Sequence, residues 1–254
     1  MDFSVSGQKV SVNVATWAAL QARVTERLAQ RQGFALATLN LDHLVKLRGL
    51  PRFRAAYAAQ DLVTADGNPI VWMSRLAGRP VELIPGSDAI LPLARIAARL
   101  GVGVALVGST AESLSRAKSY LEREVRDLTV VCTLAPPMGF DPDSPEAQAL
   151  HEQIAASGAG LCFVALGAPK QEIFAASGRR AAPAVGYVSI GAGLDFLAGM
   201  QKRAPAWARR LALEWLWRAL NSPKRLGLRY LQCLAILPGQ MLRAAVQRFR
   251  SRQA

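Results

Sequence analysis

Short apolar segments that lack polar alternation recur along residues 34–190, and a stretch with helical periodicity follows most of them. The apolar segments, which we predict to be strands, are 34–39, 61–66, 103–108, 128–134, 161–166 and 185–190. Such runs are typical of strands buried on both faces, and their alternation with helices indicates crossovers between parallel strands. The sequence therefore predicts an α/β fold with a mostly parallel sheet and helices on both faces.

Helix-start signals support the intervening helices. Ser87 or Asp88 is the expected N-cap of a helix over 87–100. Residues 109–112 have a capping-box pattern, and Pro145 occupies the first position of a further helix. Two more helices are expected, one after Asn40 and one over 169–177.

Positive charge is concentrated at the C-terminal end of the chain. Lys and Arg total 31 against 18 Asp and Glu, a formal net charge of +13. Twelve of these bases, but only one acid, Glu214, lie in residues 200–254, so the net charge is +11 there and +2 in residues 1–199. The alternation of strands and helices also stops at Gly199. We therefore predict an α/β core over 1–199 and a basic helical appendage over 200–254.

The appendage combines its arginines with Trp207, Trp215 and Trp217. Tryptophan beside arginine is typical of helices that lie on a membrane surface, and basic residues attract anionic lipids. Residues 226–237 add an apolar stretch that is too short to span a bilayer. A solvated basic face and a nucleic-acid arm are the alternatives, but the interleaved tryptophans favour a peripheral patch on an anionic membrane.

Composition excludes other classes of protein and site. Hydrophobic residues make up 51% and charged residues 19%, a balance that excludes a mostly disordered chain. No secretory signal and no transmembrane run is visible, so a cytoplasmic location is expected. Cys132, Cys162 and Cys233 are expected to be reduced, and with His43 and His151 as the only histidines no structural zinc site is expected.

Polar or glycine-rich segments follow four of the predicted strands. These strand ends are Thr38-Leu39-Asn40, then residues 64–68, 167–172 and 191–195. Ligands of parallel sheets bind at the carboxyl ends of the strands, so the four segments together predict a site. Gly167 and the helix after it could hold a phosphate on backbone N–H groups. No Walker A motif occurs and no G-x-G-x-x-G follows the first strand.

Asp66 is the preferred catalytic carboxylate, because a carboxylate at a strand end can act as general base toward a sugar hydroxyl. The alternative is that Asp66 caps the following helix. Phe140 is expected either to stack on a base or to belong to the core. Asp42 and His43 are expected in the first turn of a helix, with a catalytic His–Asp pair as the alternative.

From Gly33 to Tyr230 the sequence resembles the WecG/TagA/CpsF glycosyltransferases, glycosyltransferase family 26. The motifs that carry the resemblance are Thr38-Leu39-Asn40, Ala65-Asp66-Gly67, residues 167–172, residues 191–199, Arg203-Ala204-Pro205 with Trp207, and Glu214-Trp215-Leu216-Trp217-Arg218 followed by Pro223-Lys224-Arg225 and Arg229-Tyr230. They stand in one order along the chain, which makes the resemblance specific.

The resemblance implies a Rossmann-like core with a C-terminal helical appendage. It implies an inverting transfer of a hexose, such as glucose, N-acetylmannosamine or its uronic acid, from a UDP-sugar to a polyprenyl-diphosphate-linked acceptor at the inner face of the cell membrane. The family needs no metal or other cofactor, and no nucleic acid is implied. Family members often form dimers or trimers. Asp141-Pro142-Asp143 has the spacing of a metal-binding DxD motif, but it is interpreted as a turn.

The resemblance also assigns roles to residues. Asp66 matches the general base, Thr38 and Asn40 line the active site, and Gln171 contacts the donor. Phe140 and Asp195 match positions near the uridine. The strand-end glycines Gly108, Gly167, Gly191 and Gly193 are assigned to the donor side. Arg218, Arg225 and Arg229 match arginines of the appendage, which are expected to bind the acceptor diphosphate and touch the membrane.

The sequence departs from many family members at Trp217 and Leu194, where Phe or Tyr is common. Both changes keep a large apolar side chain and are expected to adjust specificity alone. A different class of function stays open as an alternative, a non-catalytic membrane adaptor within a polysaccharide assembly complex.

Overall fold

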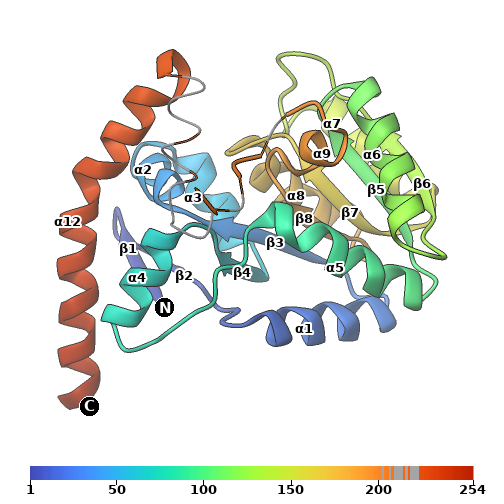
Figure 1. The fold of residues 1–254 in the computed structure, drawn as a ribbon. Coiled ribbons are helices and arrows are strands. Elements are labelled where there is room, and N and C mark those ends of the chain that lie inside the picture. Colours follow the sequence, from blue (N-terminus) through green and yellow to red (C-terminus); the bar gives the residue numbers. More distant parts are fainter. Residues whose placement is uncertain (202, 206, 209–213, 215–216, 218–222, 254) are drawn as a thin grey trace.

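Six strands form one sheet in the computed structural model, which describes residues 1–201, 203–205, 207–208, 214, 217 and 223–253 (Figure 1). The strands are β3 Phe34–Leu39, β4 Leu62–Ala65, β5 Gly103–Gly108, β6 Val130–Leu134, β7 Ala159–Ala165 and β8 Gly186–Ser189. They lie in the order β4-β3-β8-β7-β5-β6, and every neighbouring pair is parallel. The predicted parallel sheet is therefore confirmed.

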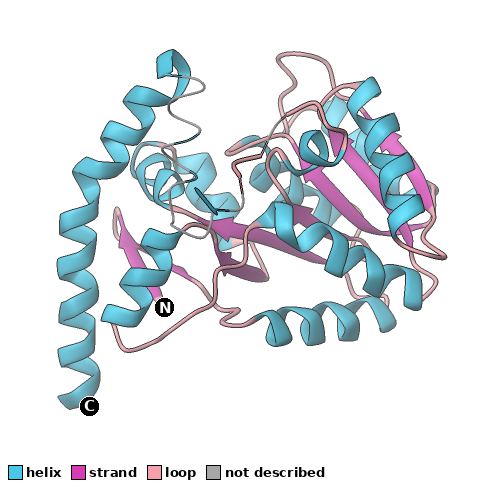
Figure 2. Cartoon of the chain, viewed as in Figure 1, coloured by secondary structure: helices cyan, strands magenta, loops and turns pink. Residues whose placement is uncertain are grey.

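Helices cover both faces of this sheet (Figure 2). They are α1 Trp17–Ala29, α2 Leu41–Gly49, α3 Pro51–Ala58, α4 Asn68–Leu76, α5 Gly86–Arg99, α6 Ala111–Glu124, α7 Pro145–Ala156, α8 Lys170–Ala181, α9 Gly193–Leu197 and α12 Pro223–Gln253. Helices α1, α5 and α6 pack on one face, and α7 and α8 pack on the other. The sequence did not predict α1, α3, α4, α9 or the antiparallel hairpin of β1 Asp2–Val5 and β2 Gln8–Ser11.

Burial on both faces explains why the strand segments are continuously apolar. Along β3, Phe34 and Leu36 face the core under α1 and α5, whereas Ala35 faces the core under α7 and α8. Phe163 on β7 and Tyr187 on β8 are likewise fully buried on opposite faces. Each such side chain contributes about 1.5–3 kcal/mol on burial, so both helical layers are held by the strands between them.

Two of the predicted helix starts are confirmed and one is wrong. Thr110 caps α6 by accepting from Ser113 N at 3.2 Å, and Ser144 caps α7 ahead of Pro145. Helix α5 instead begins at Gly86, after Pro85 at the N-cap, so neither Ser87 nor Asp88 caps it. A contact with a distant segment sets the start of α5. Gly86 packs so closely on β8 that an added Cβ would lie 2.6 Å from the Ser189 carbonyl oxygen.

The C-terminal helix α12 runs along one side of the molecule and packs against α2 and α4 (Figure 1). Its buried face carries Cys233, Ile236 and Ala244, which join the apolar cluster of α2, α3, α4 and the β1–β2 hairpin. The three cysteines are free thiols, as predicted. Among the described helices, none combines the length and the apolar character needed to cross a bilayer.

Replacing Gly186 with Ala should destabilise the fold, because a Cβ at this position would lie 2.3 Å from Cε1 of the buried Phe34 ring. Overpacking of this kind costs about 1–3 kcal/mol in free energy of unfolding. Gly227 in α12 is the matched control, since nothing lies within 4 Å of its added Cβ, and Gly227→Ala should stabilise by about 0.5–1 kcal/mol. Urea unfolding of both variants measures the difference, and equal midpoints would contradict the packing argument.

Candidate functional site

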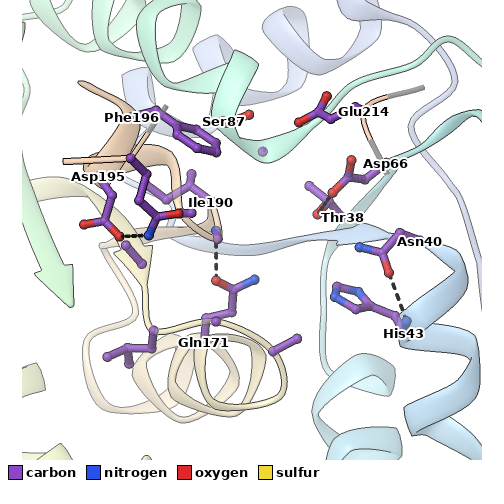
Figure 3. A pocket seen from close by; sticks show the side chains of 18 of the residues that line it. Thr38, Asn40, His43, Asp66, Ser87, Gln171, Ile190, Asp195, Phe196 and Glu214 are labelled. Carbon is purple, nitrogen blue, oxygen red and sulfur yellow. Dashed lines mark hydrogen bonds between the residues drawn. The ribbon is translucent and has the colours of Figure 1, made fainter. Parts of the chain in front are cut away.

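A cavity of about 540 Å³ opens at the carboxyl ends of β3, β4, β7 and β8 (Figure 3). The predicted site residues that line it are Thr38, Asn40, Asp66, Gly167, Gln171, Gly191, Asp195 and Arg229. The four strand ends singled out from the sequence therefore meet around one space. This agrees with the general position of ligand sites in parallel sheets.

Thr38 and Asn40 are placed by the end of β3 and the start of α2. Asn40 is the N-cap of α2, and its Oδ1 accepts from His43 N at 2.9 Å. This cap uses the carbonyl oxygen, and the amide nitrogen of Asn40 turns toward the cavity (Figure 3). Thr38 Oγ1 donates to Asp66 Oδ2 at 3.3 Å. The polar atoms of two neighbouring strands are thereby linked.

Asp66 follows β4 directly and lines the cavity. Its backbone N–H donates to Leu39 O at 2.8 Å, which extends the pairing of β3 with β4 by one residue. The N-cap of α4 is Gly67, with φ of 95° and no side-chain cap, so the alternative interpretation of Asp66 as a helix cap is wrong. The positive φ lets the chain turn away after Asp66 at a position where other residues are strained.

Gln171 holds two segments of the site together. It is 3% exposed on α8, its Oε1 accepts from Gly191 N at 3.0 Å, and its Nε2 donates to Glu172 Oε1 at 2.8 Å. The Gly191 turn after β8 is therefore fixed to the helix that follows β7. Gln171 was assigned a contact to the donor, and the structure gives it this bridging role as well.

Asp195 on α9 lines the far side of the cavity and accepts from three side chains. Ser109 Oγ and Ser113 Oγ both donate to Oδ1, the latter at 2.8 Å, and Gln201 Nε2 donates to Oδ2 at 2.7 Å. Both carboxylate oxygens are thus committed to the chain. The aromatic ring of the next residue, Phe196, also lines the cavity (Figure 3).

Three of the predicted donor residues do not line the cavity. Phe140 is 7% exposed and packs edge-on against Phe174 at 6.1 Å between ring centroids, so its environment is that of a core residue. Gly108 ends β5, where an added Cβ would lie 2.4 Å from the Ala165 carbonyl oxygen. Gly193 packs on Ile90 and borders a neighbouring hollow.

The structure describes the three predicted arginines of the appendage to different extents. Arg218 lies outside the described residues, and only the backbone of Arg225, in α12, is described. Arg229 lines the cavity, and its Nε lies 2.8 Å from Asp42 Oδ1. Asp141 and Asp143 pair with Arg52 at 3.1 and 2.7 Å. Within the described residues, no group of three or more His, Cys, Asp or Glu side chains is placed to hold a metal ion.

Five polar residues of the cavity were not among the predicted site residues, and they are His43, Lys46, Ser87, Gln201 and Glu214. Lys46 follows Asp42 by one helical turn, a spacing that could have indicated a shared face of α2. Glu214 points into the cavity near Asp66 (Figure 3). As the single acid of a segment rich in arginine, it was visible in the sequence as an exception.

His43 and Asp42 do lie in the first turn of α2, but they do not form a pair with each other. Tyr57 Oη donates to Thr38 O at 2.8 Å, and His43 Nδ1 lies 2.7 Å from the same hydroxyl. Because a hydroxyl carries one proton, Nδ1–H donates to Tyr57. Burial lowers the pKa of His43 to about 3, so the imidazole is neutral at pH 7.

Two further buried groups have displaced pKa values. Burial raises the pKa of Glu172 to about 7, although the hydrogen bond from Gln171 opposes the rise. Burial lowers the pKa of His151 to about 4, where the ring lies between Phe174 and Tyr187. At neutral pH both histidines are uncharged, and Glu172 is near the midpoint of its titration.

Comparison with protein families gives a match over almost the whole chain. The family model described as the glycosyl transferase WecG/TagA/CpsF family matches residues 5–254.

The three displaced pKa values predict how stability depends on pH. Between pH 4.5 and 6.5 the unfolded chain protonates both histidines, whereas the folded chain protonates Glu172 instead. The unfolded state therefore binds one proton more, and the free energy of unfolding should rise with pH by about 1.4 kcal/mol per unit. Glu172→Gln removes the opposing group and should raise this slope to about 2.8 kcal/mol per unit.

Urea unfolding at a series of pH values across this window measures both slopes. Glu152→Gln, on the exposed side of α7, is the control and should keep the wild-type slope. An unchanged slope in Glu172→Gln would contradict the protonated state assigned to Glu172.

Proposed function

The chain belongs to the WecG/TagA/CpsF family, glycosyltransferase family 26, and is thus a glycosyltransferase of cell-surface polysaccharide biosynthesis; on this premise we propose the reaction that its cavity performs. A hexose is transferred from a UDP-sugar to a polyprenyl-diphosphate-linked sugar, with inversion at the anomeric carbon and without a metal ion. The transfer takes place at the inner face of the cell membrane.

The position of Asp66 carries this proposal. Its carboxylate lies in the cavity beside the end of β3, where Thr38 Oγ1 donates to it. In the proposed reaction the acceptor hydroxyl attacks the anomeric carbon on the face opposite the departing UDP, and Asp66 takes the hydroxyl proton. General-base catalysis of this type contributes about 10²–10⁴-fold in rate.

Departure of UDP requires that the charge developing on its diphosphate be stabilised. Lys46 and Arg229 line the same cavity and are the cations available for this among its described residues. Fixed positive groups in a partly enclosed site stabilise such charge more strongly than water does, because they need no reorganisation. Cationic side chains thereby take the part that a divalent metal plays in other glycosyltransferases.

Asp66→Asn should lower kcat by about 10²-fold or more, because the amide cannot accept the proton while its shape is kept. The donor KM should change little. Release of UDP is measured with a series of UDP-sugars and a short polyprenyl-diphosphate-sugar acceptor. Asp143→Asn is the matched control, since Asp143 is an exposed carboxylate paired with Arg52. Near-wild-type turnover in Asp66→Asn would reject Asp66 as the base.

The membrane part of the proposal rests on α12. Five apolar side chains form an exposed stripe on the side opposite the packed face, and they are Leu228, Leu231, Leu242, Val246 and Phe249. Their helical spacing places them within one narrow sector, and each is between 41% and 69% exposed. An apolar stripe on a basic helix is typical of helices that lie in the membrane interface.

Leu242→Asp should weaken binding to anionic liposomes by about tenfold or more, because it removes an inserting side chain and adds repulsion from the lipid headgroups. Leu100→Asp is the matched control, as Leu100 is an exposed leucine at the C-terminal end of α5. Flotation with vesicles of phosphatidylglycerol and phosphatidylcholine compares the two variants with the wild type. Equal flotation of all three proteins would remove α12 from the membrane contact.

A further inference from the structure

Three charged side chains join α2 to α12 at the wall of the cavity. Asp42 Oδ2 lies 2.9 Å from Lys46 Nζ, and Asp42 Oδ1 lies 2.8 Å from Arg229 Nε. The Asp42 side chain is only 8% exposed, whereas those of Lys46 and Arg229 are 27% and 35% exposed. Lys46 and Arg229 line the cavity and Asp42 does not, so the carboxylate lies behind its two cations.

Lys46 also contacts the loop that follows β7. Its Nζ donates to the Ala168 carbonyl oxygen at 3.0 Å. The ammonium group is therefore positioned by two segments at once, α2 through Asp42 and the β7–α8 loop through Ala168. An ammonium has three N–H donors, so donor capacity is left for a ligand in the cavity that Lys46 lines.

Arg229 is held in a similar way. The pair with Asp42 uses Nε, and Arg229 makes no other ion pair with the residues that the structure describes. Its two terminal nitrogens keep the planar, paired donors that suit phosphate oxygens. Arg229 belongs to α12, whereas Asp42 and Lys46 belong to α2, so the two cations come together only when α12 is packed on the core.

The charge of this group is incomplete without a ligand. Two cations share one carboxylate, which leaves a net charge of +1 at a partly buried wall. Partly buried charges are costly unless they are paired. Asp195, another carboxylate of the cavity, accepts from serine and glutamine side chains with both of its oxygens. A diphosphate would supply the missing negative charge and the acceptor oxygens.

We propose that Lys46 binds the diphosphate of a substrate and that Asp42 positions both Lys46 and Arg229 for this contact. Asp42 is a positioning residue, because it touches the two cations and not the cavity. The inference rests on the proposed function and deepens it. It makes the docking of α12 and the binding of diphosphate parts of one equilibrium, since Arg229 is needed for both. The diphosphate is that of the nucleotide donor or that of the lipid-linked acceptor.

Calorimetric titration of the full-length protein with UDP and, separately, with farnesyl diphosphate tests Lys46 and distinguishes the two sources. Lys46→Met should weaken binding of at least one probe by about tenfold or more, because a charge-assisted contact is lost. The probe that is affected identifies the diphosphate that Lys46 binds. Unchanged affinity for both probes would overturn the proposal.

Lys118→Met is the matched control. Lys118 on α6 also donates to a backbone carbonyl, Val130 O at 3.0 Å, and lies one turn from an acidic partner, Glu122. Removing it takes away the same charge at a place outside the cavity, so both affinities should stay at wild-type values. An equal loss of affinity in both lysine variants would mean that net charge alone accounts for the effect. It would overturn the proposed contact of Lys46 with the diphosphate.

Asp42→Asn separates positioning from simple electrostatics. If Asp42 acted only through its negative charge, its removal would tighten diphosphate binding, because less repulsion would remain. Positioning predicts the opposite, a loss of about tenfold or more, together with faster hydrogen exchange in α12. Tighter or unchanged binding would overturn the role of Asp42, as would unchanged exchange in α12.

These measurements need no turnover, so their failure is distinct from failure of the proposed function. Absence of sugar transfer from every UDP-sugar would reject the reaction, whatever the titrations show. Full turnover and wild-type affinities in Lys46→Met would reject the role of Lys46 alone.

Discussion

The pairing of β3 with β4 on one side and with β8 on the other is the constraint on which the site depends. Leu39 pairs with Ala65, so Asn40 and Asp66 stand at the same level one step later. Leu36 pairs with Val188, which brings the end of β8 beside Thr38. A shift of register by one residue would turn Phe34 and Leu36 to the wrong face and separate these side chains.

A half-buried carboxylate near the other end of the sheet reinforces this register. Asp61, just before β4, accepts from Ala35 N at 2.9 Å and pairs with Arg27 and Arg179 at 3.4 and 3.2 Å. The three partners come from β3, α1 and α8. The residue that opens β4 is therefore tied to its neighbouring strand and to a helix on each face. The position of Asp66 at the far end of β4 follows from this fixed start.

The sequence was sufficient for the parallel sheet and for the residues that end its strands, because both depend on local pattern and on a general property of parallel sheets. It was not sufficient where a contact between distant segments decides the outcome. The start of α5 is set by the contact of Gly86 with Ser189, and Phe140 is drawn into the core by Phe174. Lys46 is recognisable as a site residue only once α2 lies beside the β7–α8 loop.

Carboxylates of the core compensate part of the excess positive charge in residues 200–254, since Asp88 pairs with Arg203 and Asp42 pairs with Arg229. A segment of net charge +11 repels itself. Its single acid, Glu214, lines the cavity, and among the ion pairs of the described residues Arg229 is joined to Asp42 and not to Glu214. Helix α12 nevertheless packs on α2 through its apolar face, and Asp42, a carboxylate of the nearly neutral core, lies beside Arg229. The Asp42 carboxylate also pairs with Lys46, so it compensates the charge of each cation only in part. The packing that holds α12 in place therefore leaves positive charge facing the cavity, at the place where the proposed reaction requires it.

The same geometry explains why helix α12 can contribute to two surfaces. Its inner side meets the core and the cavity, and its exposed apolar stripe stays available for the proposed membrane contact.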